Sequence, residues 1–532
     1  MYRIPSIIAQ YLSYDFTTAG SPFKDISLSL SQKRYGIVGD NGVGKTTLLK
    51  ILAKVLKPER GSLEIQGTVA YCPQINTYDN KSNVAKLLGI HNKLEALDRI
   101  DQGYYLEEDY ELIGNDWDIK TRAQQILIDL DLETIGFERT LTSLSGGQKT
   151  KCWLARAMLS YADFILLDEP TNNLDSETKD YFFNWLQKTK QGIIIASHDR
   201  QLLNYVDEII ELTSIGIQHY GGNHTFYQAQ KNTEQQAIKQ QFMAAKKQLI
   251  STEHTIQVTQ EKHERRRKKG RALRKTGKID KMAANSKQGR CEKTQSKNKI
   301  QAAHSLQKAQ DKVQLIKSHI EIKERITANL DASILPANKI IINIEELTFG
   351  FNKQKPLFIN FNLTLLGKDR LSIAGKNGTG KSTLIKIILG HLKPQMGKIY
   401  RGFSVACYLD QNLNYLTENL TLVENLCLKN PSFSLQEAYA RLAAFNFRNK
   451  LAMKRAIELS GGEYMRAGLA ISLAAEKQPQ LLILDEPTNH LDIRSIEAIE
   501  EMLCAYKGTL IVVSHDKNFL SNIGITNSIY LS

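Results

Sequence analysis

The sequence predicts an α/β protein in which two similar domains stand in tandem and are joined by an antiparallel α-helical hairpin. Three observations lead to this prediction. Four short motifs occur twice in the same order, apolar strands alternate with helices in both copies, and a basic, proline-free segment separates the copies. We place the first domain at residues 1–228, the connector at 229–335 and the second domain at 336–532.

The two copies are related by a nearly constant spacing along the chain. Gln74 and Gln411 are 337 residues apart, whereas Ser145 and Ser460 are 315 apart. The first copy therefore carries 22 extra residues between these points, and we place them near 90–115, an acidic and aromatic stretch. After the two serines the motifs repeat at a spacing of 317 residues.

Each copy has the pattern of strand, loop and helix. The strands are short and largely apolar, and 164–167 and 481–484 are apolar throughout, which is typical of parallel strands buried on both faces. The expected strands are 34–38, 164–167 and 192–196 in the first copy, and 370–374, 481–484 and 509–513 in the second. The expected helices that follow the glycine-rich loops are 45–56 and 381–389.

The connector has the pattern of two long helices. No proline lies between Pro170 and Pro336, so nothing interrupts a helix there. Heptad-spaced apolar residues on both sides of a glycine- and lysine-rich middle predict two arms of about 30 residues, roughly 45 Å each. These seam residues are Ile238, Phe242, Ala245, Leu249, Thr252 and Ile256, then Leu306, Ala309, Val313, Ile316 and Ile320.

The excess positive charge of the chain lies in this connector. The whole chain carries +14, and residues 231–331 hold 25 Lys and Arg against 10 Asp and Glu. Concentrated charge of one sign predicts a polyanionic partner, and the scarcity of aromatic residues favours phosphate contacts on a folded RNA over base stacking. The predicted RNA contacts are Arg265, Arg266, Arg267, Lys268, Lys269, Arg271, Arg274, Lys275, Lys278, Lys281, Lys287 and Arg290.

The bulk composition narrows the class of protein. No apolar run approaches the roughly 18 residues that a membrane-spanning helix needs, and the N-terminus lacks the apolar core of a secretory signal. The six cysteines are scattered and include no Cys-x-x-Cys pair, a pattern that favours reduced thiols over disulfides. We therefore expect a cytoplasmic protein with no membrane partner and no disulfide partner.

Two glycine-rich loops indicate phosphate binding. Glycines allow backbone N–H groups to point at phosphates, and the following helix adds positive potential at its N-terminus. The lysine of each loop is expected to reach the β- and γ-phosphates. The predicted nucleotide contacts are Gly39, Asp40, Asn41, Gly42, Val43, Gly44, Lys45, Thr46 and Thr47, and Gly375, Lys376, Asn377, Gly378, Thr379, Gly380, Lys381, Ser382 and Thr383.

An Asp–Glu pair ends one apolar strand in each copy. Asp168 and Asp485 are expected to hold Mg²⁺, together with the hydroxyls of Thr46 and Ser382. The glutamate that follows each aspartate is placed to polarise an attacking water. These two predicted catalytic glutamates are Glu169 and Glu486.

A histidine follows the next apolar strand in each copy. His198 and His515 recur at the 317-residue spacing, which favours a shared role over chance. Because a histidine can donate to phosphate while its other nitrogen contacts a neighbour, we expect both to contact the γ-phosphate.

Both copies resemble ATP-binding cassette (ABC) domains, a class of P-loop ATPase. The resemblance rests on the motif order and on segments 144–148 and 459–463, which look like the cassette signature. It implies that two cassettes close head to tail around two ATP molecules, Lys45 facing Ser460 and Lys381 facing Ser145. Further contacts that it implies are Gly146, Gly147, Gly461 and Gly462 on ATP, Gln74 and Gln411 on Mg²⁺, and Phe16 and Phe351 on adenine.

The whole chain resembles the ABC-F family. The resemblance rests on tandem cassettes, on Glu-Pro-Thr-Asn at 169–172 and 486–489, and on the segment 220–227 before a long charged linker. It implies an ATPase that works as a monomer with an intramolecular cassette dimer. It also implies binding to the ribosome, with the linker reaching toward tRNA and the peptidyl-transferase centre.

Two other functions are compatible with the sequence. Positive charge alone does not separate RNA from DNA, so a DNA-structure or repair ATPase stays open. Two cassettes in one chain are also compatible with the fused ATPase subunit of a transporter. Within translation, the sequence leaves elongation, ribosome assembly, rescue of stalled ribosomes and antibiotic protection open.

Overall fold

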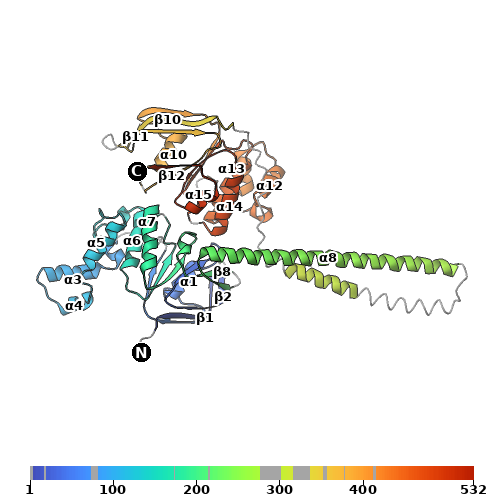
Figure 1. Ribbon diagram of the computed structural model, residues 1–532, viewed down its shortest axis with the longest axis horizontal. Helices are drawn as coiled ribbons and strands as arrows, with labels where there is room; N and C mark the ends of the chain where they lie inside the picture. Colours follow the sequence, from blue (N-terminus) through green and yellow to red (C-terminus); the bar gives the residue numbers. More distant parts are fainter. Residues whose placement is uncertain are drawn as a thin grey trace. The chain divides into compact units, whose positions relative to one another are not determined.

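The computed structural model describes residues 4–16, 20–73, 82–172, 174–213, 216–275, 301–315, 336–351, 356–376, 378–410, 415–489 and 491–531. It forms two compact units (Figure 1). One unit, Met1–Thr225 with Arg325–Ser532, contains both α/β domains, and the other is Phe226–Glu324. Within the described ranges, no helix is both long and apolar enough to span a membrane.

A six-stranded sheet forms the centre of the first domain. Its order is β5-β6-β7-β3-β8-β9, and only the last pair is antiparallel. The bounds are β5 Val69–Cys72, β6 Phe164–Asp168, β7 Gly192–Ala196, β3 Arg34–Val38, β8 Glu208–Thr213 and β9 Gly216–Gly221. The three strands predicted for this domain are therefore confirmed, β6 being one residue longer.

The second domain repeats this sheet with five parallel strands. Its order is β14-β15-β16-β12-β17. The bounds are β14 Ala406–Leu409, β15 Leu481–Asp485, β16 Thr509–Val513, β12 Arg370–Gly375 and β17 Asn527–Leu531. The predicted strands are confirmed here as well, β12 and β15 each extending one residue further.

Both faces of these sheets are buried, as their largely apolar runs predict. In β15, Leu481 and Ile483 pack on the side of α10 (Lys381–Leu389). Their neighbours Leu482 and Leu484 pack on the opposite side, in the core that also holds the helices α13 (Gly461–Ala474) and α14 (Ile493–Ala505).

Each domain also has a three-stranded antiparallel sheet that the sequence analysis did not predict. The orders are β2-β1-β4 and β11-β10-β13. The bounds are β1 Ser6–Phe16, β2 Gly20–Leu30 and β4 Arg60–Gln66, and β10 Ile340–Phe349, β11 Phe358–Leu366 and β13 Met396–Arg401. In the first domain this sheet shares one core with α1 and the parallel sheet, since Ile7, Ile37 and Leu48 belong to the same buried cluster.

The helix predicted at 45–56 is shorter than expected, since α1 spans Lys45–Leu52. Lys54 adopts a left-handed conformation with φ of 58°. The Lys54 N–H donates to the carbonyl of Ile51, and the Val55 N–H donates to that of Lys50. This pair of bonds is the Schellman pattern that ends helices. The helix predicted at 381–389 is confirmed as α10.

The remaining helices surround the sheets. In the first domain they are α2 Val84–Leu88, α3 His91–Asp101, α4 Glu107–Ile113, α5 Ile119–Asp129, α6 Gly146–Leu159 and α7 Ser176–Lys188. In the second domain they are α11 Leu422–Lys429, α12 Leu435–Ala444, α13, α14 and α15 Lys517–Asn522. The first domain thus has two helices, α3 and α4, between α2 and α5. In the second domain α12 follows α11 with no helix between them.

The first arm of the connector is one long helix, α8 (His224–Lys275), drawn in green in Figure 1. With 52 residues it spans about 78 Å, so the predicted arm of about 30 residues was too short. The helix continues into the glycine- and lysine-rich middle of the connector, through 265–269, because Arg and Lys are good helix formers. Residues 301–315 form a helix in the second arm.

The heptad pattern of the connector is visible in its burial. Along α8 the predicted seam residues are less exposed than their neighbours, and Ala245 is only 3% exposed. Leu306, Ala309 and Val313 are likewise less exposed than the residues between them. The described part of each arm therefore shields the face that its sequence predicts, whereas Ile316 and Ile320 lie outside the described residues.

The shared core of α1 gives a first testable prediction. Leu48 is fully buried between the two sheets of the first domain, so Leu48→Ala should reduce the free energy of unfolding by about 2–5 kcal/mol. Val55, beyond the end of α1, is 60% exposed, so Val55→Ala should change it by less than about 0.5 kcal/mol. Urea unfolding of both variants checks this, and equal effects would contradict the core that we describe.

Candidate functional site

Three neighbouring parallel strands bring the predicted catalytic residues of each domain together. In the first domain β6, β7 and β3 are adjacent, and at their carboxyl ends lie Asp168, His198 and the glycine loop. In the second domain β15, β16 and β12 place Asp485, His515 and the second loop in the same way. We call the group around Lys45 and His198 the first site, and the group around Lys381 and His515 the second site.

The start of each loop requires glycine. Gly39 and Gly375 have φ of 156° and 151°. A Cβ at Gly39 would lie 2.3 Å from the carbonyl oxygen of Leu212, and one at Gly375 would lie 2.4 Å from that of Leu531. The first loop therefore passes directly beside β8, and the second passes directly beside β17. The helices α1 and α10 begin directly after the loops, and the N–H groups of a first helical turn can bind an anion.

The loop lysines lie over their own loops. Lys45 Nζ donates to the carbonyl of Gly39 at 2.8 Å, and Lys381 Nζ donates to that of Gly375 at 2.6 Å. In the second site, Lys381 Nζ also lies 3.2 Å from Nε2 of His515. Burial lowers the pKa of both lysines. A negatively charged ligand beside each lysine would stabilise its protonated form.

The aspartate of each site fits a divalent cation. Asp485 accepts from the hydroxyl of Ser382 at 3.0 Å and from that of Tyr408 at 3.2 Å, and burial raises the pKa of its carboxyl group. In the first site burial likewise raises the pKa of Asp168. Its Oδ2 is buried and has no hydrogen-bonding partner among the residues that the structure describes. A buried hard oxygen donor beside a hydroxyl suits Mg²⁺.

The two glutamates have unusual backbones. Glu169 and Glu486 both have φ of 48°, and their N–H groups donate to the carbonyls of Ala196 and Val513 at 2.8 Å. Left-handed backbone at a non-glycine residue is costly and gathers at functional sites. Burial raises the pKa of both carboxyl groups, that of Glu486 to about 7, so each is suited to accept a proton near neutral pH.

The two histidines stand beside these glutamates in a neutral state. Nε2 of His198 is 3.8 Å from Glu169, and Nε2 of His515 is 3.5 Å from Glu486. Burial lowers the pKa of His198 to about 3 and that of His515 to about 4. Within the described ranges neither ring nitrogen of His198 has a hydrogen-bonding partner.

The two signature segments begin helices. Ser145 caps α6, where its Oγ accepts from the Gln148 N–H at 3.2 Å. Ser460 caps α13 in the same way through Glu463, at 3.3 Å. Both form a capping box, in which the third residue bonds back to the serine N–H.

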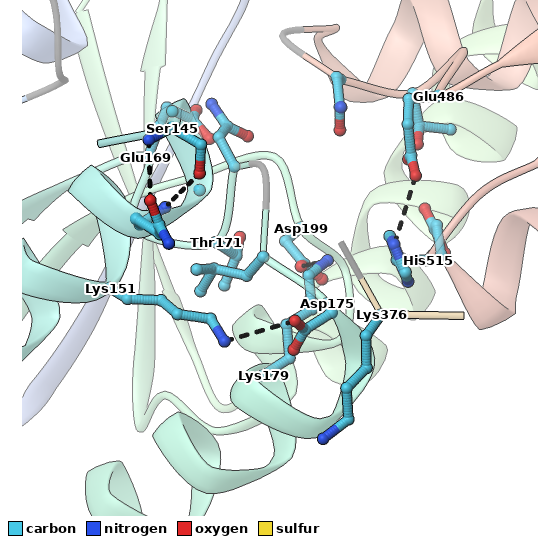
Figure 2. Close-up of a pocket in the computed structure, with 18 of the residues that line it drawn as sticks. Ser145, Lys151, Glu169, Thr171, Asp175, Lys179, Asp199, Lys376, Glu486 and His515 are labelled. Atoms are coloured by element: carbon cyan, nitrogen blue, oxygen red, sulfur yellow. Dashed lines mark hydrogen bonds and ion pairs between the residues drawn. The ribbon is translucent and has the colours of Figure 1, made fainter. Parts of the chain in front are cut away.

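A cavity of about 810 Å³ joins the signature of the first domain to the loop of the second. Its lining includes Ser145, Gly146 and Gly147 as well as Lys376 and Gly378. Figure 2 shows Lys151 pointing toward Asp175, with the Glu486–His515 pair of the other domain nearby. The structure therefore brings together the second loop and the signature that the resemblance pairs with it.

The first loop borders a smaller cavity, of about 340 Å³. It is lined by residues of its own domain, among them Lys45, Asp168 and His198, and by none from 460–462. The contacts of this loop with the second domain come instead from the start of α14. The N–H of Asn41 donates to Asp492 at 3.3 Å.

Ion pairs join each glycine loop to the other domain, with reversed charges. Lys376 lies 2.7 Å from Glu177, the second residue of α7. At the corresponding positions Asp40 lies 3.0 Å from Arg494, the second residue of α14. These four side chains are 44–56% exposed, so each pair is screened by solvent and contributes less than about 1 kcal/mol.

A buried ion pair joins the two domains. Arg200 donates to Glu500 at 2.9 Å, and the two side chains are 6% and 11% exposed. Asn522 donates to the same carboxylate oxygen at 3.1 Å. Within the first domain, Lys179 and Asp199 form another buried pair, at 2.8 Å. Paired charges of this kind are costly to separate, because each leaves the other buried alone.

Several predicted residues lie outside these sites or outside the described residues. Phe351 is 73% exposed and packs edge-on against Phe349. Arg265 and Lys268 are exposed on α8. Gln74, Gln411, Asn377, Lys278, Lys281, Lys287 and Arg290 lie outside the described residues, as do the side chains of Phe16, Arg266, Arg267, Lys269, Arg271, Arg274 and Lys275.

Sequence reasoning missed the residues that start α7 and α14. Asp175 and Asp492 cap these helices, and the Leu-Asp segment that holds them repeats at the 317-residue spacing, so the repeat contained a signal for both. Lys179 and Arg200 gave no such signal, because Ile496 and Lys517 stand at the corresponding positions.

Comparisons with known proteins agree with this geometry. Residues 23–172 and 358–489 match the sequence model of the family described as "ABC transporter". "ATP-binding protein Uup" of Buchnera aphidicola is 32% identical over 499 residues, which cover 92% of this chain and 74% of Uup. "ABC transporter F family member 5" of Arabidopsis thaliana is 30% identical over 533 residues, covering 94% and 71%.

The solved structure of "RNase-L Inhibitor" has the same fold, with a TM-score of 0.58 and 17% identity over 97% of this chain and 87% of that one.

Two ABC domains in one chain define an ATP-binding protein of the ABC class. Within that class, the chain belongs to the ABC-F family, as its match to a named family member over most of both chains shows. The family's cassettes bind ATP and support its hydrolysis.

The neutral histidines give a prediction on pH. An unfolded histidine binds a proton below about pH 6.5, whereas burial holds the pKa of His198 at about 3 in the folded chain. The stability that this difference provides is present above pH 6.5 and is lost as the pH falls toward 3. In His198→Gln, the loss of unfolding free energy between pH 7.5 and 5 should be smaller by about 2 kcal/mol.

Urea unfolding at both pH values measures this loss. The matched control is His254→Gln, on an exposed position of α8, which should leave the pH dependence as it is in the parent. An unchanged pH dependence in His198→Gln would show that His198 is not held neutral.

Proposed function

We propose that this ABC-F protein hydrolyses ATP with Mg²⁺ at two composite sites, binds the ribosome in the cytoplasm and acts through its basic connector on tRNA and the peptidyl-transferase centre. The observation that carries the proposal is the 810 Å³ cavity in which the loop of one domain meets the signature of the other. The chain would work as a monomer, since both halves of that cavity come from one chain.

The residues of the second site have complementary roles in this proposal. The loop N–H groups and Lys381 would bind the phosphates. Ser382 and Asp485 would hold Mg²⁺, which would supply positive charge beside the phosphates. Glu486 accepts a proton from the attacking water, and its raised pKa suits that step. Ser145, at the start of α6, donates to the far end of the nucleotide and so makes closure depend on ATP.

The connector supplies the contact with RNA. Residues 231–331 carry a net charge of +15, whereas the rest of the chain carries −1. Phosphate-rich surfaces bind such segments by releasing counterions. A solved structure of similar fold is named "archaeal ribosome recycling factor aABCE1". It has a TM-score of 0.55 and 16% identity over 96% of this chain and 86% of that one. That likeness supports a ribosomal partner for this chain.

The first experiment traps the closed state. Glu169→Gln with Glu486→Gln removes both general bases while leaving ATP binding intact, so this double variant should sediment with ribosomes in ATP and not in its absence. Lys45→Ala with Lys381→Ala, which removes the phosphate contacts, is the matched control and should stay unbound. Absence of ribosome binding in every condition would refute the proposed partner.

The second experiment separates the connector from the cassettes. Arg265→Glu with Lys268→Glu, in the trapped background, should weaken ribosome binding by about tenfold or more at 100 mM salt, because several phosphate contacts are lost. Lys246→Glu with Lys247→Glu makes the same charge change at exposed positions nearer the start of α8 and should weaken it less. Equal effects of the two pairs would show that only total charge matters.

A further inference from the structure

The first residue of α7 contacts the histidine of the other domain. Oγ of Ser176 lies 3.4 Å from Nδ1 of His515. This contact reaches the second site from the opposite side to Glu486 and Lys381, which lie near Nε2 of the same ring. Both nitrogens of His515 therefore have polar neighbours.

The neighbours of Ser176 fix its position against the second domain. Asp175 caps α7 by accepting from the N–H and the hydroxyl of Thr178, at 3.0 and 2.6 Å. Glu177 pairs with Lys376 and accepts from the hydroxyl of Tyr530 at 3.3 Å. The first turn of α7 is thus held on both sides of the serine.

In the part of the chain that the structure describes, the first site has no equivalent of this contact. At the 317-residue spacing, Ile493 corresponds to Ser176, and its side chain has no group that forms hydrogen bonds. Among the described residues, both ring nitrogens of His198 are without a hydrogen-bonding partner. The two histidines thus occupy equivalent strand ends but meet chemically different neighbours.

A hydroxyl suits the histidine of a phosphate site because it can both donate and accept. An ammonium group only donates, so next to Lys381 the Nε2 of His515 accepts and Nδ1–H donates to Ser176. To bind phosphate, Nε2 must carry the proton, and Ser176 can then rotate its hydroxyl to donate to Nδ1. Isoleucine supports neither state.

We propose that Ser176 is a positioning residue for His515, and that it makes the two composite sites unequal, the second site hydrolysing ATP faster than the first. This inference rests on the proposed hydrolysis at both sites. Ser176 acts through His515. It belongs to the first domain, whereas the loop that would bind the phosphates belongs to the second. Turnover at the second site therefore depends on the position of α7 relative to the second domain.

The test measures each site by itself. Glu169→Gln leaves hydrolysis at the second site, and Glu486→Gln leaves it at the first. The first variant should turn over faster than the second. Ser176→Ala should then lower turnover about tenfold with Glu169→Gln, as the loss of one hydrogen bond implies, and change it less than twofold with Glu486→Gln. Ser176→Thr, which keeps the hydroxyl, should restore turnover.

A second readout does not depend on turnover. In ¹⁵N-histidine-labelled protein, Ser176→Ala should shift the ring-nitrogen resonances of His515 and leave those of His198 unchanged. The resonances are assigned with His515→Gln and His198→Gln. Thermal unfolding of Ser176→Ala checks that the variant is folded.

The outcomes separate this inference from the proposed function. Equal loss of turnover in both backgrounds, no loss in either, unshifted His515 resonances or failure of Ser176→Thr to restore turnover would each overturn the positioning role while leaving ATP hydrolysis in place. Equal turnover in the two parent backgrounds would overturn the inequality of the sites. Absence of hydrolysis in the unaltered chain would overturn the proposed function itself.

Discussion

The adjacency of three parallel strands in each domain is the constraint on which the sites depend. Because β6, β7 and β3 are neighbours, the acid pair, the histidine and the glycine loop meet at one edge although they are far apart in the chain. The strands are held in place because the side chains on both of their faces are buried and close-packed among other apolar groups. The relative positions of the site residues at this edge therefore depend on the packing of the apolar core.

Around this common frame the two domains present different surfaces to each other. The catalytic positions repeat with little change, whereas several residues that touch the opposite domain differ between the two copies. Arg200 pairs with Glu500, but their counterparts in the repeat are Lys517 and Phe183. Duplication explains the frame, and the unlike surfaces explain how one chain can hold two sites with different surroundings.

Much of this could be predicted from the sequence, since the signals were local. Largely apolar runs such as 192–196 and 509–513 identify buried strands, and the glycine loops identify the starts of α1 and α10. The left-handed backbone of Glu169 could not be predicted, because it follows from a hydrogen bond to the neighbouring strand. The length of α8 was underestimated because the glycine- and lysine-rich middle was expected to end the first arm, whereas Lys and Arg favour helix.

The reversed ion pairs beside the loops have a consequence for assembly. If two first domains from separate chains met in the same way, Asp40 would face Glu177, and two second domains would bring Lys376 against Arg494. Like charges at those distances repel, and only the unlike combination brings opposite charges together at both edges. Because the pairs are exposed and weak, this preference is small, but at both edges it favours the pairing of unlike halves over the pairing of two copies of one half.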